Sequence, residues 1–212
     1  MQNILHLVQI NKSIPVTPPK DGEGGPRGKK RRETRQRIAD TGLRLFLANG
    51  YEATTLDAVA AAAGISRRSF FSYFKSKEDI VMAGLAGAWE TVWADLLTQS
   101  PDAAPLAAVR DTMLRHIARY ESEQMLAMHR LMRSSATLLA RKQASYGAQE
   151  EALHAVLCQV WRQPQRRPAL RLVAMVAVGA MRLAIDGWCE APEGPSAVRL
   201  FLDALDALKA EL

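Results

Sequence analysis

A chain of 212 residues is long enough to bury a sizeable core, so its fold requires neither disulfide bonds nor a structural metal. The formal charge of +6 is unevenly distributed: residues 1–77 carry 14 basic and 6 acidic side chains, whereas residues 78–212 carry 14 and 16. The two cysteines exclude a disulfide-rich framework and favour a reducing cytoplasm. A basic front third followed by a near-neutral body indicates a module that binds a polyanion, joined to a module with another task.

No segment of the sequence has the pattern of a membrane span. The longest apolar block, residues 172–181, is bracketed by Arg171 and Arg182 and is well short of the roughly 20 residues that a span requires. The apolar start over residues 4–10 lacks the leading basic run and the cleavage site of a secretory signal. We therefore expect a soluble, cytoplasmic protein with no membrane partner.

The first segment combines proline and glycine over residues 11–28, which predicts a disordered leader over residues 1–28. The run RGKKRRETRQR at residues 27–37 then carries seven basic side chains and one acidic one. Apolar residues at helical spacing follow and predict a helix from about Thr34 to Asn49, which Gly50 ends.

Two short helices are predicted next, with only three residues between them. Residues 56–63 follow the N-cap residue Thr55, and residues 67–74 follow the N-cap residue Ser66. Ala60 is small where two helices cross, Gly64 can adopt a positive φ, and Phe70 is placed to point inward as a wedge. This spacing is typical of a helix-turn-helix, with an ordinary helical hairpin as the alternative.

The rest of the sequence is helical in pattern, without the alternation of a strand, which predicts an all-α fold. Breaks in the pattern divide it into six helices, near residues 78–99, 103–121, 123–134, 136–162, 167–189 and 196–211. We expect a helix-turn-helix domain over residues 29–77 and a helical domain over residues 78–212.

The segment from Arg37 to Val81 resembles the DNA-binding region of the TetR family of bacterial transcriptional regulators. The residues that carry the resemblance are Leu45, Phe46, Gly50, Tyr51, Thr54, Thr55, Ala60, Ala63, Gly64, Ile65, Ser66, Tyr73, Phe74, Ser76, Lys77 and Glu78. The resemblance covers about 45 residues. It implies an N-terminal three-helix DNA-binding domain, a C-terminal domain for ligand binding and dimerisation, a double-stranded DNA operator, and no enzymatic activity.

Three positions depart from the family pattern. Gly42 stands where alanine is usual, and this loosens the first helix by up to about 1 kcal/mol. Arg68 replaces a common glycine, and Phe71 replaces a tyrosine that usually reaches a phosphate. The string SRRSFFSYFKSKED resembles a subgroup that includes the mycofactocin-locus regulator, which implies an acyl-CoA type of ligand.

The candidate DNA-binding residues lie on the second short helix and at helix starts. The solvent face of that helix offers Ser66, Arg67, Arg68, Ser69 and Ser72. Arg67 and Arg68 are the candidate base readers, because a guanidinium matches the O6 and N7 of guanine; Arg68 could instead hold phosphate. The candidate phosphate contacts are Thr54, Thr55, Tyr73 and Lys77.

The basic run ahead of the first helix has two interpretations. Lys29, Lys30, Arg31 and Arg32 could form an arm that follows the DNA backbone or enters a minor groove. Alternatively, the run is a solvated stretch without a partner.

The body contains apolar and soft side chains that suit a pocket for a large apolar effector such as an acyl-CoA. The candidates are Trp89, Trp93, Met113, His116, Met125, Met128, Met132, Cys158 and Trp161. The alternative for each of them is a place in the core. The helices at 167–189 and 196–211 are apolar enough either to complete a monomer core or to form a four-helix interface in a homodimer.

Other chemistry finds little support in the sequence. His154 and Cys158 have the spacing of two metal ligands, but no third ligand is near in sequence, so we expect neither metal nor cofactor. Arg162, Arg166 and Arg167 could hold a ligand phosphate or be solvated. The sequence lacks the motifs of a nucleophile elbow, a phosphate-binding loop or a dinucleotide fingerprint, so an enzyme is disfavoured. A DNA-binding architectural protein without a ligand is the second alternative.

Overall fold

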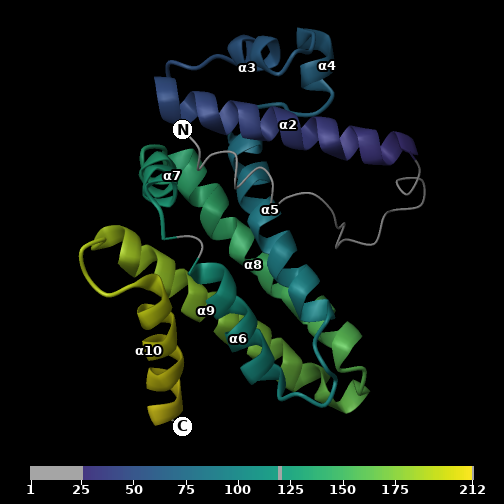
Figure 1. Cartoon of the computed structure of the whole chain (residues 1–212), viewed down its shortest axis with the longest axis vertical. Coiled ribbons are helices and arrows are strands. Elements are labelled where there is room, and N and C mark those ends of the chain that lie inside the picture. The colour runs from purple at the N-terminus through teal and green to yellow at the C-terminus, as the bar shows by residue number, and fades with distance from the viewer. Residues whose placement is uncertain (1–25, 119–120, 212) are drawn as a thin grey trace. The chain divides into compact units, whose positions relative to one another are not determined.

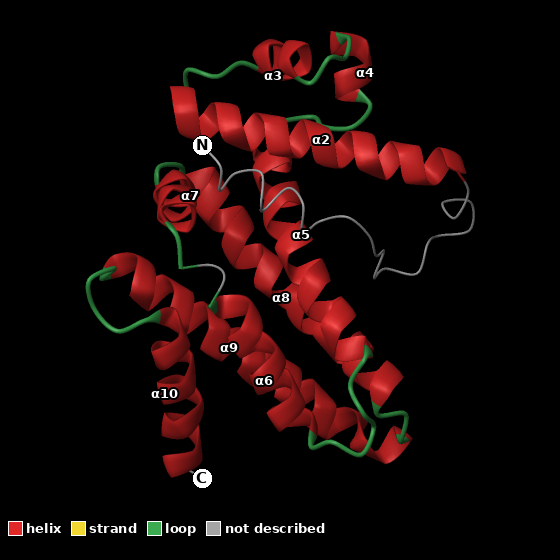
Figure 2. Ribbon diagram, viewed as in Figure 1, coloured by secondary structure: helices red, strands yellow, loops and turns green. Residues whose placement is uncertain are grey.

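The structure is a computed structural model that describes residues 26–118 and 121–211, all of them in helices, turns and loops without a strand (Figure 2). Two compact units divide the chain, one up to Thr91 and the other from Val92. The all-α fold predicted from the sequence is confirmed. The predicted leader lies outside the described residues except for residues 26–28.

The first unit contains α2 (Pro26–Asn49), α3 (Leu56–Ala62), α4 (Arg67–Phe71) and the larger part of α5 (Lys77–Leu97) (Figure 1). Its core is built from apolar side chains of all four helices and of the turn after α4. These are Ile38, Ala39, Phe46, Val59, Ala60, Phe70, Phe74, Ile80 and Val81. Ala60 and Phe70 are buried as the sequence predicted.

The first helix is longer than the sequence analysis expected. α2 begins at Pro26, eight residues before Thr34. Proline is favourable in the first helical turn, and the lysines, arginines and glutamate that follow are good helix formers, so their preference outweighs the charge repulsion along the run. Residues 26–28 are therefore helical, contrary to the predicted leader.

The second unit contains the end of α5 together with α6 (Pro105–Ile117), α7 (Glu123–Arg133), α8 (Ala136–Val160), the 3₁₀ turn η1 (Pro164–Arg166), α9 (Arg167–Glu190) and α10 (Ala197–Ala210). α9 packs against α6, α7, α8 and α10, and is the central helix of this unit. It buries eight residues: Leu170, Ala174, Ala177, Val178, Ala180, Met181, Ala184 and Trp188.

Two helical stretches of the described chain are long and apolar enough to cross a membrane by length and composition alone: α5 and residues 164–190, with mean hydropathy 1.3 and 1.7. The central helix of a helical domain passes the same test, because it is apolar on most of its faces. The packing of α9 against four other helices accounts for the apolar residues on its buried side.

Candidate nucleic-acid interface and effector region

The turn between α3 and α4 is fixed by main-chain hydrogen bonds. The N–H of Ile65 donates to the carbonyl of Ala60 at 3.1 Å, and that of Gly64 to Ala61 at 3.0 Å, which is the Schellman arrangement. Gly64 has φ of +67°, a conformation that glycine adopts without strain. The Ser66 hydroxyl then caps α4 by accepting from the N–H of Ser69 at 3.1 Å. Together these contacts set the direction in which α4 leaves the turn.

Arg67 is the first residue of α4 and lies on its solvent side, with 72% of its side chain exposed. Its Nε is 3.2 Å from Oδ1 of Asp57, in the first turn of α3. Its Cζ is 5.8 Å from the centre of the Phe71 ring, one turn further along α4. The guanidinium is thus both exposed and held in place.

The other polar residues of α4 are exposed as well, but several hydroxyls have local partners. Ser66 and Ser69 share a hydrogen bond between hydroxyls at 2.9 Å, and the Ser72 hydroxyl donates to the carbonyl of Ser69 at 2.6 Å. Arg68 is exposed. Ser66, Arg67, Arg68, Ser69 and Ser72 are therefore all exposed within or next to α4, and the two arginines are the longest of these side chains.

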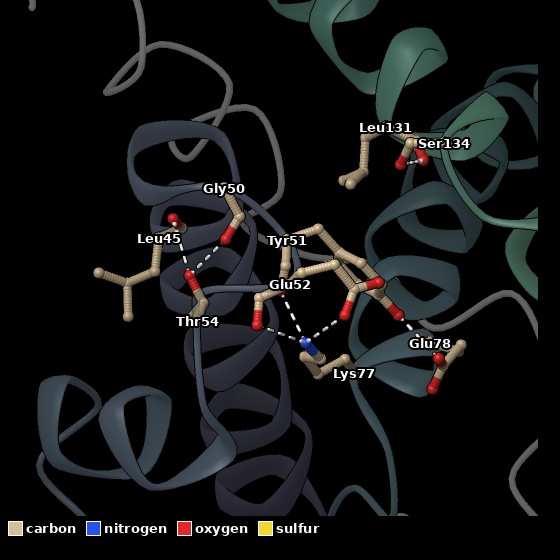
Figure 3. Close-up of polar contacts among 9 residues, drawn as sticks. All are labelled: Leu45, Gly50, Tyr51, Glu52, Thr54, Lys77, Glu78, Leu131 and Ser134. Atoms are coloured by element: carbon tan, nitrogen blue, oxygen red, sulfur yellow. Dashed lines mark hydrogen bonds and ion pairs between the residues drawn. The ribbon is translucent and has the colours of Figure 1, made fainter.

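Thr54 does not lie where a phosphate contact requires it. The residue is 3% exposed, and its hydroxyl donates to the carbonyls of Gly50 at 2.8 Å and Leu45 at 3.3 Å (Figure 3). The side chain therefore closes the end of α2. Thr55 is exposed and caps α3, its hydroxyl accepting from the N–H of Ala58 at 3.1 Å.

Lys77 is occupied by the loop between α2 and α3. Its ammonium donates to the carbonyl of Tyr51 at 2.7 Å and to that of Glu52 at 3.3 Å, and it lies 4.6 Å from the Tyr51 ring centre (Figure 3). The Tyr51 hydroxyl in turn donates to Glu78 at 2.8 Å. These contacts argue against the phosphate contact expected for Lys77.

The run of basic residues ahead of Thr34 lies within α2. Lys29, Lys30, Arg31 and Arg32 are exposed residues within α2, so they do not form an extended arm before the first helix. Arg35, on the same helix, lies over the ring of buried Phe74, with its Cζ 4.8 Å from the ring centre. Tyr73 is half-buried in the turn that follows α4.

The residues predicted to line an effector pocket divide by burial. Trp93, Met113, His116, Met132 and Trp161 are buried, and Trp89, Met125, Met128 and Cys158 are half-buried. All belong to the second unit except Trp89, which precedes the division at Thr91.

Two of the buried residues make polar contacts that hold the second unit together. Nε2 of His116 is 2.8 Å from Oδ2 of Asp95, and the Trp161 indole donates to the carbonyl of Ala103 at 2.9 Å. These contacts favour the core alternative for the two side chains.

A cavity of about 870 Å³ opens beside the ends of α5 and α8. Its lining residues are Leu97, Gln99, Pro101, Gln159, Val160, Arg162, Gln163, Pro164 and Gln165. None of the nine predicted pocket residues lines it. Arg162, one of the arginines weighed as a phosphate holder, does line it, with its Nε donating to the carbonyl of Gln159 at 3.0 Å.

His154 and Cys158 lie close together, with Sγ 3.3 Å from Nε2 of the histidine. The same histidine nitrogen is 3.2 Å from the carbonyl of Arg167. Within the described parts of the chain, no group of three or more histidine, cysteine, aspartate or glutamate side chains is placed to hold a metal ion. The short distance between the two side chains is that of a hydrogen bond.

A polar cluster between α7, α8 and α9 was not anticipated. Lys142 Nζ is 2.7 Å from Oδ1 of Asp186, and His129 Nδ1 is 4.0 Å from the same oxygen. Burial lowers the pKa of His129, and nearby Lys142 lowers it further. His129 Nε2 is buried without a hydrogen-bond partner. His129 and Asp186 are far apart in sequence, so no spacing rule connects them.

The outer face of α9 exposes apolar side chains. Leu172 is 62% exposed, Met175 45% and Leu183 67%. Their spacing of three, eight and eleven residues places them along one side of the helix. Leu208 of α10 is also 39% exposed. An apolar helix face of this length is typical of a protein–protein interface.

The structure combines a helix-turn-helix, formed by α3 and α4, with a second helical unit; we call this helix-turn-helix the reader. The model of the bacterial regulatory proteins of the tetR family matches residues 38–83. The transcriptional regulator AcuR of Cereibacter sphaeroides is 30% identical over 159 residues, 73% of this chain and 68% of that protein. The regulator TcmR of Streptomyces glaucescens is 28% identical over 200 residues, 89% of this chain and 88% of that protein.

The fold is also similar to that of SmeT, the repressor of the Stenotrophomonas maltophilia multidrug efflux pump SmeDEF. This SmeT structure and that of the SmeT–triclosan complex align with TM-scores of 0.58 and 0.59. Both are 19% identical, with 84% of this chain and 89% and 91% of those chains covered.

The chain belongs to the TetR family. It is a DNA-binding transcriptional regulator, and its relatives are regulators rather than enzymes. The mycofactocin biosynthesis regulator MftR of Mycobacterium tuberculosis is 42% identical over 53 residues, 25% of this chain and 27% of that protein. Because this match is limited to about a quarter of each chain, the narrower subgroup stays a prediction.

Proposed function

We propose that the protein is a cytoplasmic repressor that binds a palindromic operator as a homodimer and is released from it by a small apolar effector. The observation that carries the proposal is the exposed N-terminal edge of α4, where Arg67 and Arg68 extend from a helix fixed by the Gly64 turn. A helix presented in this way enters a major groove, and a guanidinium there contacts guanine O6 and N7.

The homodimer follows from the apolar face of α9. Two copies of this face, with α10 beside them, would cover Leu172, Met175 and Leu183 in a four-helix interface. A two-fold axis through such an interface presents two copies of α4, and half-sites about 34 Å apart are then read on a roughly palindromic operator.

The effector is proposed to occupy the second unit, against the methionines of α7 and Trp93 of α5. An apolar ligand fits this region because methionine adapts its shape and tryptophan offers a broad face. The structure of SmeT with triclosan provides an apolar probe, and a long-chain acyl-CoA provides the ligand type that the sequence indicated.

Release requires that the effector binds one conformation of the dimer more tightly than the other. α5 is the element through which this difference reaches the reader, since it begins in the first unit and ends in the second. A dimer whose two α4 helices no longer match the groove spacing then leaves the operator.

Binding-site selection from random duplex DNA, followed by titration of the selected site with triclosan or lauroyl-CoA, tests the proposal. We expect enrichment of an inverted repeat and loss of binding with one of the two probes. Enrichment of no sequence at low salt would overturn the proposed reader. Tight binding that neither probe changes would favour the ligand-independent architectural protein.

A further inference from the structure

Arg67 contacts two side chains that also belong to the helix-turn-helix itself: Asp57 lies in the first turn of α3, and the Phe71 ring packs edge-on against buried Phe70 with 5.6 Å between ring centres. Asp57 comes from the first turn of α3 and contacts Arg67 Nε at 3.2 Å. Phe71 comes from α4 itself, and its ring centre is 5.8 Å from Arg67 Cζ. Both partners are on the exposed side of the reader, since the Asp57 side chain is 58% exposed and Phe71 41%.

The contact with Asp57 engages one particular part of the guanidinium. An arginine side chain has five N–H donors, one on Nε and four on the two Nη atoms. A bidentate contact with guanine needs two donors side by side. Because Asp57 lies at Nε, the edge formed by the two Nη atoms can face O6 and N7 of a base.

The two contacts also restrict the side chain. A free arginine samples many rotamers, and ordering it on DNA costs conformational entropy. The carboxylate restrains Arg67 on one side, and the face of the Phe71 ring attracts the cation on another. A guanidinium ordered before binding loses less entropy when it docks on its base.

Neither contact is well explained by folding or by affinity for DNA. Exposed ion pairs contribute little to protein stability. A carboxylate beside the reading edge repels phosphates and so weakens binding to any duplex. Phe71 has no hydroxyl that could donate to a phosphate. Its ring instead lies under the Arg67 cation.

We infer that Asp57 and Phe71 are positioning residues that set the base specificity of Arg67, with Asp57 lowering overall affinity for DNA in exchange for discrimination. This inference rests on the proposed function, because it requires that Arg67 reads a base. It assigns the exposed carboxylate and the exposed aromatic ring to one shared task.

The test uses the full-length protein and three duplexes: the selected operator, the operator with the guanine read by Arg67 replaced, and a random sequence. A bidentate contact contributes roughly 5- to 150-fold discrimination. For Asp57→Asn we expect discrimination at that base pair to fall by about three- to tenfold. Affinity for the random duplex should rise, because one negative charge is removed. A merely structural role for Asp57 would not move these two quantities in opposite directions.

Glu33→Gln is the matched control, since Glu33 is an exposed carboxylate of α2 in the same unit. It should raise affinity for every duplex and leave discrimination unchanged. Asp57→Glu keeps the charge but displaces the carboxylate, so it should reduce discrimination without the gain in random binding. Asp57→Glu also decides the matter if Asp57→Asn is poorly folded.

Phe71 is tested by exchanging its ring. Phe71→Leu should lower discrimination at the same base pair as Asp57→Asn, whereas Phe71→Tyr keeps the ring and should retain it. In an Arg67→Ala background, Asp57→Asn should no longer change base preference, because the residue it positions is gone.

Different results would overturn the proposed function and the positioning role. If the wild-type protein selects no sequence, the proposed function is overturned. If the operator is selected and Arg67→Ala loses discrimination, but the Asp57 and Phe71 variants keep it at every base pair, the positioning role is overturned and the proposed function stands.

Discussion

Gly42 of α2 lies so close to Ile80 of α5 that a Cβ on residue 42 would be 2.6 Å from Ile80 Cγ2. The same Cβ would be 3.4 Å from Cγ1 of Val59 in α3. Gly42 is therefore the point at which three helices of the first unit approach one another. Cγ2 is attached directly to the β-carbon of a fully buried isoleucine, so it has little freedom to move away.

Gly42→Ala should destabilise the first unit. The alanine gains up to about 1 kcal/mol in helix propensity, but crowding in a packed core costs about 1–3 kcal/mol. We expect a net loss of about 1–2 kcal/mol in the free energy of unfolding, measured by urea denaturation. Gly147→Ala in α8 is the control: no atom lies within 4 Å of its Cβ position, so it should stabilise. Increased stability of Gly42→Ala would contradict the close approach.

Lys77→Met should affect stability before it affects DNA binding. It leaves the carbonyls of Tyr51 and Glu52 without the ammonium that they accept from, at a cost of about 1–2 kcal/mol. We expect a lower melting temperature, with base preference retained at a temperature where the variant is folded. Lys75→Met, a change of an exposed lysine two residues earlier, serves as the control. A variant as stable as wild type but weaker on every duplex would restore Lys77 as a phosphate contact.

Leu183→Glu should convert the dimer into monomers. Leu183 is 67% exposed on α9, so a glutamate is tolerated by the monomer but is buried by the proposed interface. Sedimentation equilibrium should show a mass close to one chain of 23.3 kDa, and affinity for the operator should fall steeply. Leu106→Glu on α6, which is 37% exposed, should remain a dimer. A dimeric Leu183→Glu protein would place the interface elsewhere.

The second unit should lose stability as the solution becomes mildly acidic. Burial lowers the pKa of His129 below its ordinary value of 6.5, and Lys142 and Arg133 act in the same direction against Asp186 and Glu190. Below pH 6.5 the unfolded chain therefore binds a proton that the folded chain does not, so unfolding becomes more favourable as pH falls. The free energy of unfolding should drop from about pH 7 to about pH 5, and His129→Leu should reduce that slope. An unchanged slope in His129→Leu would show that other groups cause the pH dependence of the free energy of unfolding.

The Cys189 thiol should react slowly with alkylating reagents. Burial raises its pKa from 9.0 to about 11. At pH 8 the thiolate, which is the reactive form, is then about a hundredfold scarcer than in the unfolded chain. Alkylation by iodoacetamide in a Cys158→Ser background should be correspondingly slow and should accelerate as pH rises. Equal rates for folded and urea-unfolded protein would show that the thiol is not shielded.

The sequence predicted the reader because its signals are local. The caps at Thr55 and Ser66, the turn at Gly64 and the wedge at Phe70 each depend on residues within about one helical turn, and all four lie where expected. The predicted start of α2 is eight residues too late, because the nearby prolines and glycines indicated a leader, whereas good helix formers follow Pro26.

The side-chain partners could not be predicted in the same way. Thr54 bonds to a carbonyl nine residues away, Lys77 to one 26 residues away, and Asp57 meets Arg67 across the turn. Whether residues so far apart in sequence meet depends on which faces of the helices pack together, and the spacing of residues along the chain does not determine that packing. Phosphate contacts were accordingly predicted for Thr54 and Lys77, whereas both side chains donate to backbone carbonyls of the protein.

Three consecutive residues at the start of α5 hold three different groups. Lys77 holds the carbonyl of Tyr51, Glu78 holds the hydroxyl of the same tyrosine, and Asp79 accepts from the backbone N–H of Lys75 at 3.1 Å. Rotation of the first turn of α5 would therefore either break the Lys77 and Glu78 contacts or displace the α2–α3 connection with it. Fraying of this helix end would have to break the same contacts first, so the connection also protects the start of α5.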